Sequence, residues 1–141
     1  MSEFKPKKSV ALSGVPAGST ALSAVGQGDL HYRGYSIKDL ATHCQFEEVA
    51  FLLVHGELPN QKQLDSYKSK LKGLRGLSPA VKTVLEQIPA SAHAMDVLRT
   101  AFSTVGAVTP ESTQHTESEA RDIADSMLAK TGSILGYWHH F

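Results

Sequence analysis

From residue 36 onward, apolar residues recur every three or four positions, the spacing that places them on one face of an α-helix. Phe46, Val49, Ala50 and Leu53 are one such set, and Met95, Leu98, Phe102 and Val105 are another. Capping residues and prolines at the starts, and glycines and prolines at the ends, divide this part of the chain into separate helices. The predicted helices span residues 36–43, 46–55, 61–74, 79–88, 93–108 and 120–138.

Helix starts are marked by local signals. The Ser36–Asp39 segment resembles a capping box with Asp in place of Glu, and Ser78-Pro79 combines an N-cap residue with a proline at the first helical position. The sequence predicts side-chain caps at both places.

Residues 9–37 have a different pattern, in which glycines and a proline separate short apolar runs. This pattern predicts short strands joined by turns. Two or three strands of this length do not form a stable sheet alone, so we expect them to lie against the helices. Residues 1–8 are predicted to be a disordered tail. The predicted fold class is therefore mainly α, with a short N-terminal β segment.

The last predicted helix keeps its apolar spacing up to Trp138, and Phe141 follows without a closing glycine, proline or polar segment. Helices commonly end with such a signal. The pattern therefore predicts that residues 9–141 form an incomplete, truncated domain. Its uncovered apolar face at 120–138 would favour poor solubility or self-association.

Composition narrows the class of protein. The 141 residues include 14 Lys+Arg and 14 Asp+Glu, and this balance argues against a nucleic-acid-binding surface. No apolar run approaches the roughly 18 residues of a membrane span, and the first thirty residues lack a secretory signal. The single cysteine, Cys44, excludes an internal disulfide and is predicted to be a buried or half-buried thiol. These features favour a cytoplasmic protein without a membrane partner.

None of the seven histidines has the spacing of a metal-ligand pair. His139 and His140 are adjacent, so on a helix their side chains diverge. Glu47 and Glu48 fall in the first turn of a predicted helix, where acids interact favourably with the helix dipole. The sequence therefore predicts no metal site, no bound cofactor and no catalytic residue within this chain.

Two residues have both a structural and a functional interpretation. Arg33 lies between two tyrosines, where it could stack on a ring and donate to backbone carbonyls, or bind an anion. His93 begins an apolar helix, where it could cap the helix start or act in catalysis. The structural interpretation is favoured for both.

Three segments resemble motifs of the citrate synthase family: residues 32–41 (YRGYSIKDLA), 46–59 (FEEVAFLLVHGELP) and 93–100 (HAMDVLRT). The resemblance extends from Lys7 to Phe141 and corresponds to the N-terminal part of family members. Within the family, residues 6–18, 67–71 and 120–125 are similar to the bacterial 2-methylcitrate synthases. One departure is Ala94, where the family usually has proline. The structural signature consists of Tyr32, Arg33, Gly34, Tyr35, His93 and Met95.

The resemblance implies a mainly helical, citrate-synthase-like large domain in a homodimer. Family members condense an acyl-CoA with oxaloacetate, and the acyl-CoA of the 2-methylcitrate type is propionyl-CoA, in propionate catabolism. One Asp and two His act by acid–base and electrostatic catalysis, and all three lie downstream of the matching region. The resemblance therefore implies that this chain is inactive alone. The one substrate contact it suggests falls near Lys70, whereas the mid-helix position of Lys70 favours a solvated side chain.

Two alternatives remain open at the level of sequence. The chain could come from a citrate synthase that uses acetyl-CoA, because the residues that would select the acyl group are absent. It could instead be a non-catalytic module that associates with a full-length synthase through the helices at 93–108 and 117–141.

Overall fold

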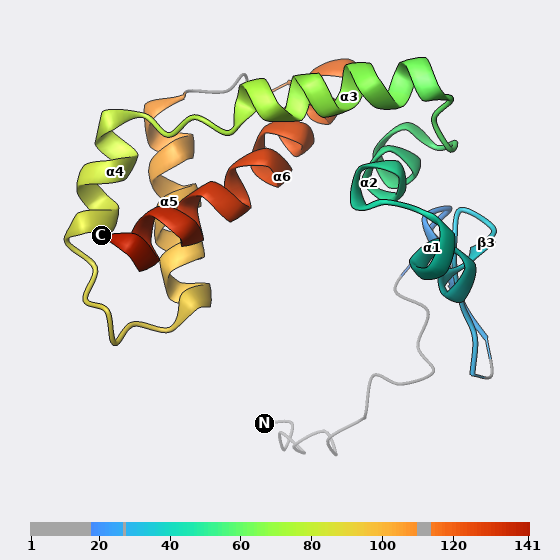
Figure 1. Ribbon diagram of the computed structural model, residues 1–141, viewed down its shortest axis with the longest axis horizontal. Helices are drawn as coiled ribbons and strands as arrows, with labels where there is room; N and C mark the ends of the chain where they lie inside the picture. The colour runs from blue at the N-terminus through green and yellow to red at the C-terminus, as the bar shows by residue number, and fades with distance from the viewer. Residues whose placement is uncertain (1–17, 27, 110–113) are drawn as a thin grey trace, which may run out of the picture.

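The computed structural model describes residues 18–26, 28–109 and 114–141, so the predicted disordered tail of residues 1–8 lies outside the described residues. The described part contains a small antiparallel sheet followed by helices (Figure 1). The elements are β1 (Ser23–Val25), β2 (Leu30–Tyr32), β3 (Tyr35–Ser36), α1 (Ile37–His43), α2 (Phe46–His55), α3 (Gln61–Leu74), α4 (Pro79–Glu86), α5 (Ala94–Val108) and α6 (Glu117–His140). This confirms the predicted mainly α class with an N-terminal β segment.

The sheet has the strand order β1-β2-β3, and Tyr32 pairs with both Ser23 and Tyr35. A two-residue turn formed by Arg33 and Gly34 connects β2 to β3. Both residues have positive φ angles, 49° for Arg33 and 90° for Gly34. A two-residue hairpin turn of type I′ has this left-handed backbone at both central positions, and glycine adopts it without strain. The hairpin thus accounts for the Arg-Gly pair of the sequence motif.

The helices are arranged as two groups joined by α3 (Figure 1). The sheet, α1 and α2 lie at one end of α3, and α4, α5 and α6 lie toward the other. Helix α6 packs against α3, α4 and α5 and also contacts α2. It is therefore a second link, besides α3, between the two groups.

Two clusters of buried side chains hold the helices together. In the first, Ile134 of α6 packs among Val81 and Leu85 of α4 and Val97 and Ala101 of α5. In the second, Ala50 of α2 packs with Tyr67 and Leu71 of α3, and Leu128 and Ala129 of α6 cover them. The first cluster organises the α4–α6 bundle, and the second joins α2 to α3 and α6.

Some residues of the predicted apolar faces are not in the core. Phe46 is 65% exposed, Met95 63% and Met127 46%, whereas Leu52 and Val97 are fully buried. The predicted helices are confirmed with shifts at some ends, since α4 ends at Glu86 and α6 begins at Glu117. Apolar spacing alone does not place Phe46 and Met95 in the core. Both residues lie in the first turns of their helices, α2 and α5.

The observed helix caps agree only in part with those predicted from the sequence. At α6, Thr116 accepts from the backbone N–H of Glu119, and the Glu119 carboxylate accepts from the backbone N–H of Thr116. At α4, Ser78 accepts from Val81 as predicted. The predicted cap at Ser36 is wrong, because its side chain makes no capping bond and its backbone continues β3 into α1.

Because Thr116 makes a capping bond and Ser36 does not, replacing each by alanine should change the free energy of unfolding by different amounts. Thr116→Ala is expected to lower the free energy of unfolding by about 1 kcal/mol, the usual contribution of a side-chain cap. Ser36→Ala is expected to change it by less than about 0.5 kcal/mol, because no capping bond is lost. Urea unfolding followed by circular dichroism measures both variants. Equal losses would contradict the cap assignment.

Candidate functional site

Lys70 is held between α3 and α6. Its Nζ atom lies 2.6 Å from Oδ1 of Asp122 and 2.6 Å from Oδ2 of Asp125. The Lys70 side chain is 39% exposed, so the ammonium group stands at the edge of the helix interface. Lys70 is exposed, in keeping with the expected solvated side chain, but it is also paired with two carboxylates. The packing of α6 along α3 brings two carboxylates to it, and the order of the helices along the chain does not reveal that packing.

Asp125 is fully buried and is the centre of this cluster. Its Oδ1 atom accepts a hydrogen bond of 2.7 Å from the Tyr67 hydroxyl, and its Oδ2 atom pairs with Lys70. A buried carboxylate is costly unless it is paired and hydrogen-bonded, and both requirements are met here. Asp125 was not predicted as a site residue, because several polar residues occur in 120–138 and none is marked by its spacing as buried.

The pKa shifts show what this cluster can do chemically. Burial alone would lower the pKa of Lys70, but hydrogen bonds to Asp122 and Asp125 outweigh it and raise that pKa. Burial and the hydrogen bond to Asp125 raise the pKa of Tyr67 well above its ordinary value. Hydrogen bonding to Lys70 lowers the pKa of Asp122. Lys70 and Tyr67 thus keep their protons at neutral pH. The cluster, called the clip below, links α3 to α6 electrostatically through Tyr67, Lys70, Asp122 and Asp125.

His55 lies next to the clip at the end of α2. Its ring stacks on Phe51 at a centroid distance of 4.2 Å and meets Tyr67 edge-on at 5.6 Å. Its Nε2 atom is buried and has no hydrogen-bond partner among the described residues. Burial lowers the pKa of His55, and the Asp125 carboxylate opposes that shift. The ring is therefore held in its neutral form within an aromatic cluster.

His55 should make the stability of the chain sensitive to mild acid. Because the folded state lowers the pKa of His55, the unfolded chain binds a proton more readily, and stability falls as pH drops through the ordinary histidine pKa of about 6.5. His55→Phe keeps an aromatic ring there and removes the titration. The melting temperature should therefore fall less between about pH 7 and about pH 5 in the variant than in the unaltered chain. An equal decrease in both would contradict the assignment.

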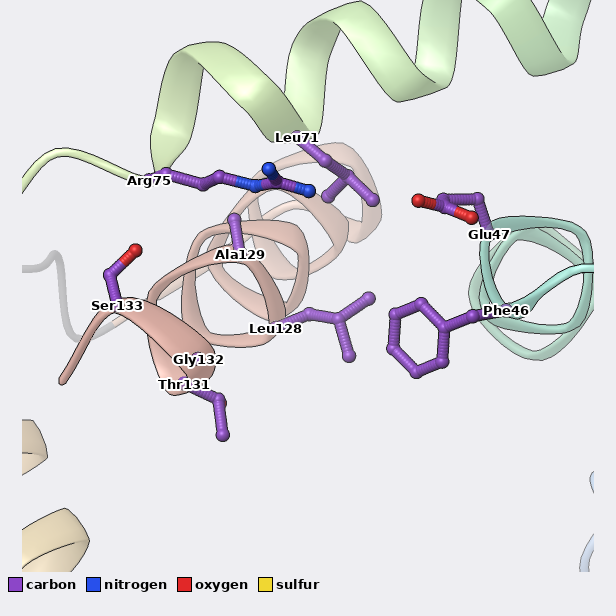
Figure 2. A pocket seen from close by; sticks show the side chains of 9 residues that line it. All are labelled: Phe46, Glu47, Leu71, Arg75, Leu128, Ala129, Thr131, Gly132 and Ser133. Carbon is purple, nitrogen blue, oxygen red and sulfur yellow. The ribbon is translucent and has the colours of Figure 1, made fainter. Parts of the chain in front are cut away.

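Two hollows border these helices. One, of about 330 Å³, is lined by Phe51, His55, Lys62, Gln63, Ser66, Tyr67 and Lys70. The other is a groove of about 570 Å³ between α2, α3 and α6, lined by Phe46, Glu47, Leu71, Arg75, Leu128, Ala129, Thr131, Gly132 and Ser133 (Figure 2). Neither hollow was predicted from the sequence, because each forms only where side chains of different helices pack side by side.

The signature residues of the hairpin have structural roles. The Arg33 guanidinium donates from Nη2 to the backbone carbonyl of Leu53 at 3.2 Å, which ties the β2–β3 hairpin to α2. This confirms the predicted carbonyl contact. The predicted stacking of Arg33 on a tyrosine is not found among the ring contacts of the described residues. Tyr35 is 45% exposed and ends the hairpin beside Gly34.

His93 and Met95 are likewise explained by the start of a helix. His93 is the N-cap of α5, and its Nδ1 atom accepts a hydrogen bond of 3.2 Å from the backbone N–H of Met95. This confirms the capping interpretation of His93. Ala94 occupies the first helical position without disturbing the cap.

Neither a metal site nor a membrane span is found in the described part of the chain. Within residues 18–26, 28–109 and 114–141, no group of three His, Cys, Asp or Glu side chains is arranged to hold a metal ion. No helix in the described part is both long and apolar enough to cross a membrane. Cys44 is half-buried at the end of α1, as predicted.

Comparisons with known proteins agree on one family. The family model for citrate synthase, C-terminal domain, matches residues 11–141. The 2-methylcitrate synthase of Shewanella oneidensis is 52% identical over 143 aligned residues, which cover 100% of this chain and 37% of that protein. A citrate synthase of Mycolicibacterium smegmatis is 41% identical over 104 residues, which cover 72% of this chain and 28% of that protein. The chain thus spans roughly a third of the length of these relatives.

A solved structure shows the same fold. Citrate synthase from Thermoplasma acidophilum, in a ternary complex with carboxymethyl coenzyme A and oxaloacetate, superposes with a TM-score of 0.80 at 23% sequence identity. The superposition covers 90% of this chain and 35% of that protein. Sequence motifs, family model and fold therefore agree, and the chain belongs to the citrate synthase family.

Proposed function

We propose that this chain is the N-terminal part of a 2-methylcitrate synthase, which condenses propionyl-CoA with oxaloacetate to give 2-methylcitrate and CoA in propionate catabolism. The observation that carries the proposal is the 52% identity with the Shewanella 2-methylcitrate synthase over the whole chain. Identity with the Mycolicibacterium citrate synthase is lower, at 41%, and covers less of the chain. The order of the three motifs supports the N-terminal position.

The geometry of the described residues supports a scaffolding role for this part of the enzyme. Lys70 and Tyr67 keep their protons at neutral pH, because the pKa of each is raised. Burial lowers the pKa of His55, and its Nε2 atom is buried without a hydrogen-bond partner among the described residues. We therefore infer that the acid–base groups of the reaction come from a part of the enzyme outside this chain, and that the chain alone is inactive. The assembly would be a cytoplasmic homodimer.

A chimeric enzyme tests the proposal. This chain would replace the matching third of the Shewanella 2-methylcitrate synthase, and release of the CoA thiol from propionyl-CoA and oxaloacetate would be followed with a thiol reagent. The chimera is expected to be active, and the chain alone is expected to release nothing above the blank. A matched control places this chain in the Mycolicibacterium citrate synthase, where poorer helix packing should reduce activity with acetyl-CoA.

Two outcomes would contradict the proposal. The first is a correctly folded Shewanella chimera that is inactive while the Mycolicibacterium chimera works, which would favour the citrate synthase alternative. The second is CoA release by the chain alone that disappears when one of its residues is changed. His93 would then be the first residue to replace.

Lys70 is the one candidate for a substrate contact in this chain. Its ammonium group has a third N–H beyond the two that face Asp122 and Asp125, and it borders the 330 Å³ hollow. In the active chimera, Lys70→Met combined with Asp125→Asn removes the ammonium group without leaving a buried charge. A KM for oxaloacetate raised several-fold, with kcat retained, would support the contact. An unchanged KM would leave Lys70 with the structural role alone.

A further inference from the structure

The groove between α2, α3 and α6 has one cation and one anion on opposite sides. Arg75, at the C-terminal end of α3, and Glu47, in the first turn of α2, extend toward one another across it (Figure 2). They do not form an ion pair with each other, and neither side chain has a hydrogen-bond or ion-pair partner among the described residues. Two complementary charges thus face the same space, and both are available to a ligand.

The rest of the groove is apolar and open. Leu71 lies between the two charges, Leu128 faces Phe46, and Phe46, 65% exposed, forms one wall (Figure 2). On α6, Gly132 leaves additional space, because a Cβ atom added there would meet no atom within 4 Å. The volume of about 570 Å³ lies within the range of about 300–1,000 Å³ that is usual for small-molecule sites.

We propose that this groove binds a zwitterionic α-amino acid with an apolar side chain. The carboxylate of the ligand pairs with the Arg75 guanidinium, its ammonium group pairs with the Glu47 carboxylate, and its side chain contacts Phe46, Leu71 and Leu128.

The charges decide the class of ligand. A simple anion would be attracted by Arg75 but repelled by Glu47. A simple cation would be attracted by Glu47 but repelled by Arg75. A zwitterion satisfies both, and guanidinium–carboxylate pairs are well suited to such recognition. Since both charges are accessible to water, each pair contributes modestly, and an affinity on the order of millimolar is expected.

Titration of the full chain with L-leucine tests the proposal, with the methyl signals of Leu71 and Leu128 followed by NMR. Saturable shifts of these signals are expected. Leucine amide lacks the carboxylate, 4-methylpentanoate lacks the ammonium group, and glycine lacks the apolar side chain. Each of these three compounds should bind at least about tenfold more weakly than L-leucine. Equal responses to leucine and 4-methylpentanoate, or no saturable response to leucine up to its solubility limit, would overturn the proposal.

Variants separate binding from folding. Arg75→Gln and Glu47→Gln should each weaken leucine binding about tenfold, whereas Lys72→Gln, a neighbour on α3 outside the groove, should not. Gly132→Leu should fill the groove and abolish binding while it favours the helix, since leucine is the better helix former. Binding that survives Gly132→Leu in a folded chain would also overturn the proposal.

Discussion

Replacing Lys70 by methionine is expected to lower the free energy of unfolding by about 2–3 kcal/mol. The reason is Asp125, which is fully buried and would lose the cation that compensates its charge. Removing one partner of a buried ion pair costs about 3–5 kcal/mol when both partners are enclosed. Lys70 is 39% exposed, so water can replace part of its contribution, and the estimate is reduced accordingly.

A second substitution should reverse most of this loss. In Lys70→Met combined with Asp125→Asn, the buried group is neutral and its carbonyl oxygen can still accept the hydrogen bond from Tyr67. Urea unfolding of the single and double variants, with Lys72→Met as an exposed control on the same helix, measures the effect. If Lys70→Met were no more damaging than Lys72→Met, the clip would not stabilise the fold.

The loss of folding stability at alkaline pH depends on the same contacts. Folding raises the pKa of both Lys70 and Tyr67, so above about pH 10 the folded state holds protons that the unfolded chain releases. Their contribution is complete below their ordinary pKa values and is lost as pH rises. The clip is thus a feature of the neutral pH range, where the electrostatic contacts between α3 and α6 are intact.

Much of the fold could be predicted from local sequence because helix ends depend on a few neighbouring residues. Helix α3 begins and ends where the sequence placed it, since Asn60 caps its start and Gly73 and Gly76 weaken the helix at its end. The turn at Arg33 and Gly34 and the cap at His93 are equally local. Each depends on contacts within a short stretch or on one contact with the next element.

Features that depend on packing between distant elements could not be predicted. Asp125 is buried only because α6 lies along α3, and an acid within an apolar pattern does not identify its partners. Phe46 and Met95 fit the apolar spacing of their helices, but spacing alone does not say where along a helix the neighbouring elements begin. The groove charges, Arg75 and Glu47, are 28 residues apart and face the same groove only because α2 packs against α3.

The α4–α6 bundle should depend most strongly on Ile134. Ile134 is fully buried among Val81, Leu85, Val97 and Ala101, so it contacts both other helices of the bundle. Ile134→Ala is expected to lower the free energy of unfolding by about 3–4 kcal/mol, because a cavity is added to the lost apolar burial.

Met127→Ala is the matched control on the same helix. Met127 fits the apolar spacing of α6 equally well but is 46% exposed, so its truncation should cost less than about 1 kcal/mol. Urea unfolding monitored through Trp138, which donates to the carbonyl of Ile88 at the edge of this bundle, follows both variants. Comparable losses would mean that α6 is rotated from the observed register. A large loss confined to Ile134→Ala would show that α4, α5 and α6 form a cooperative core within this chain.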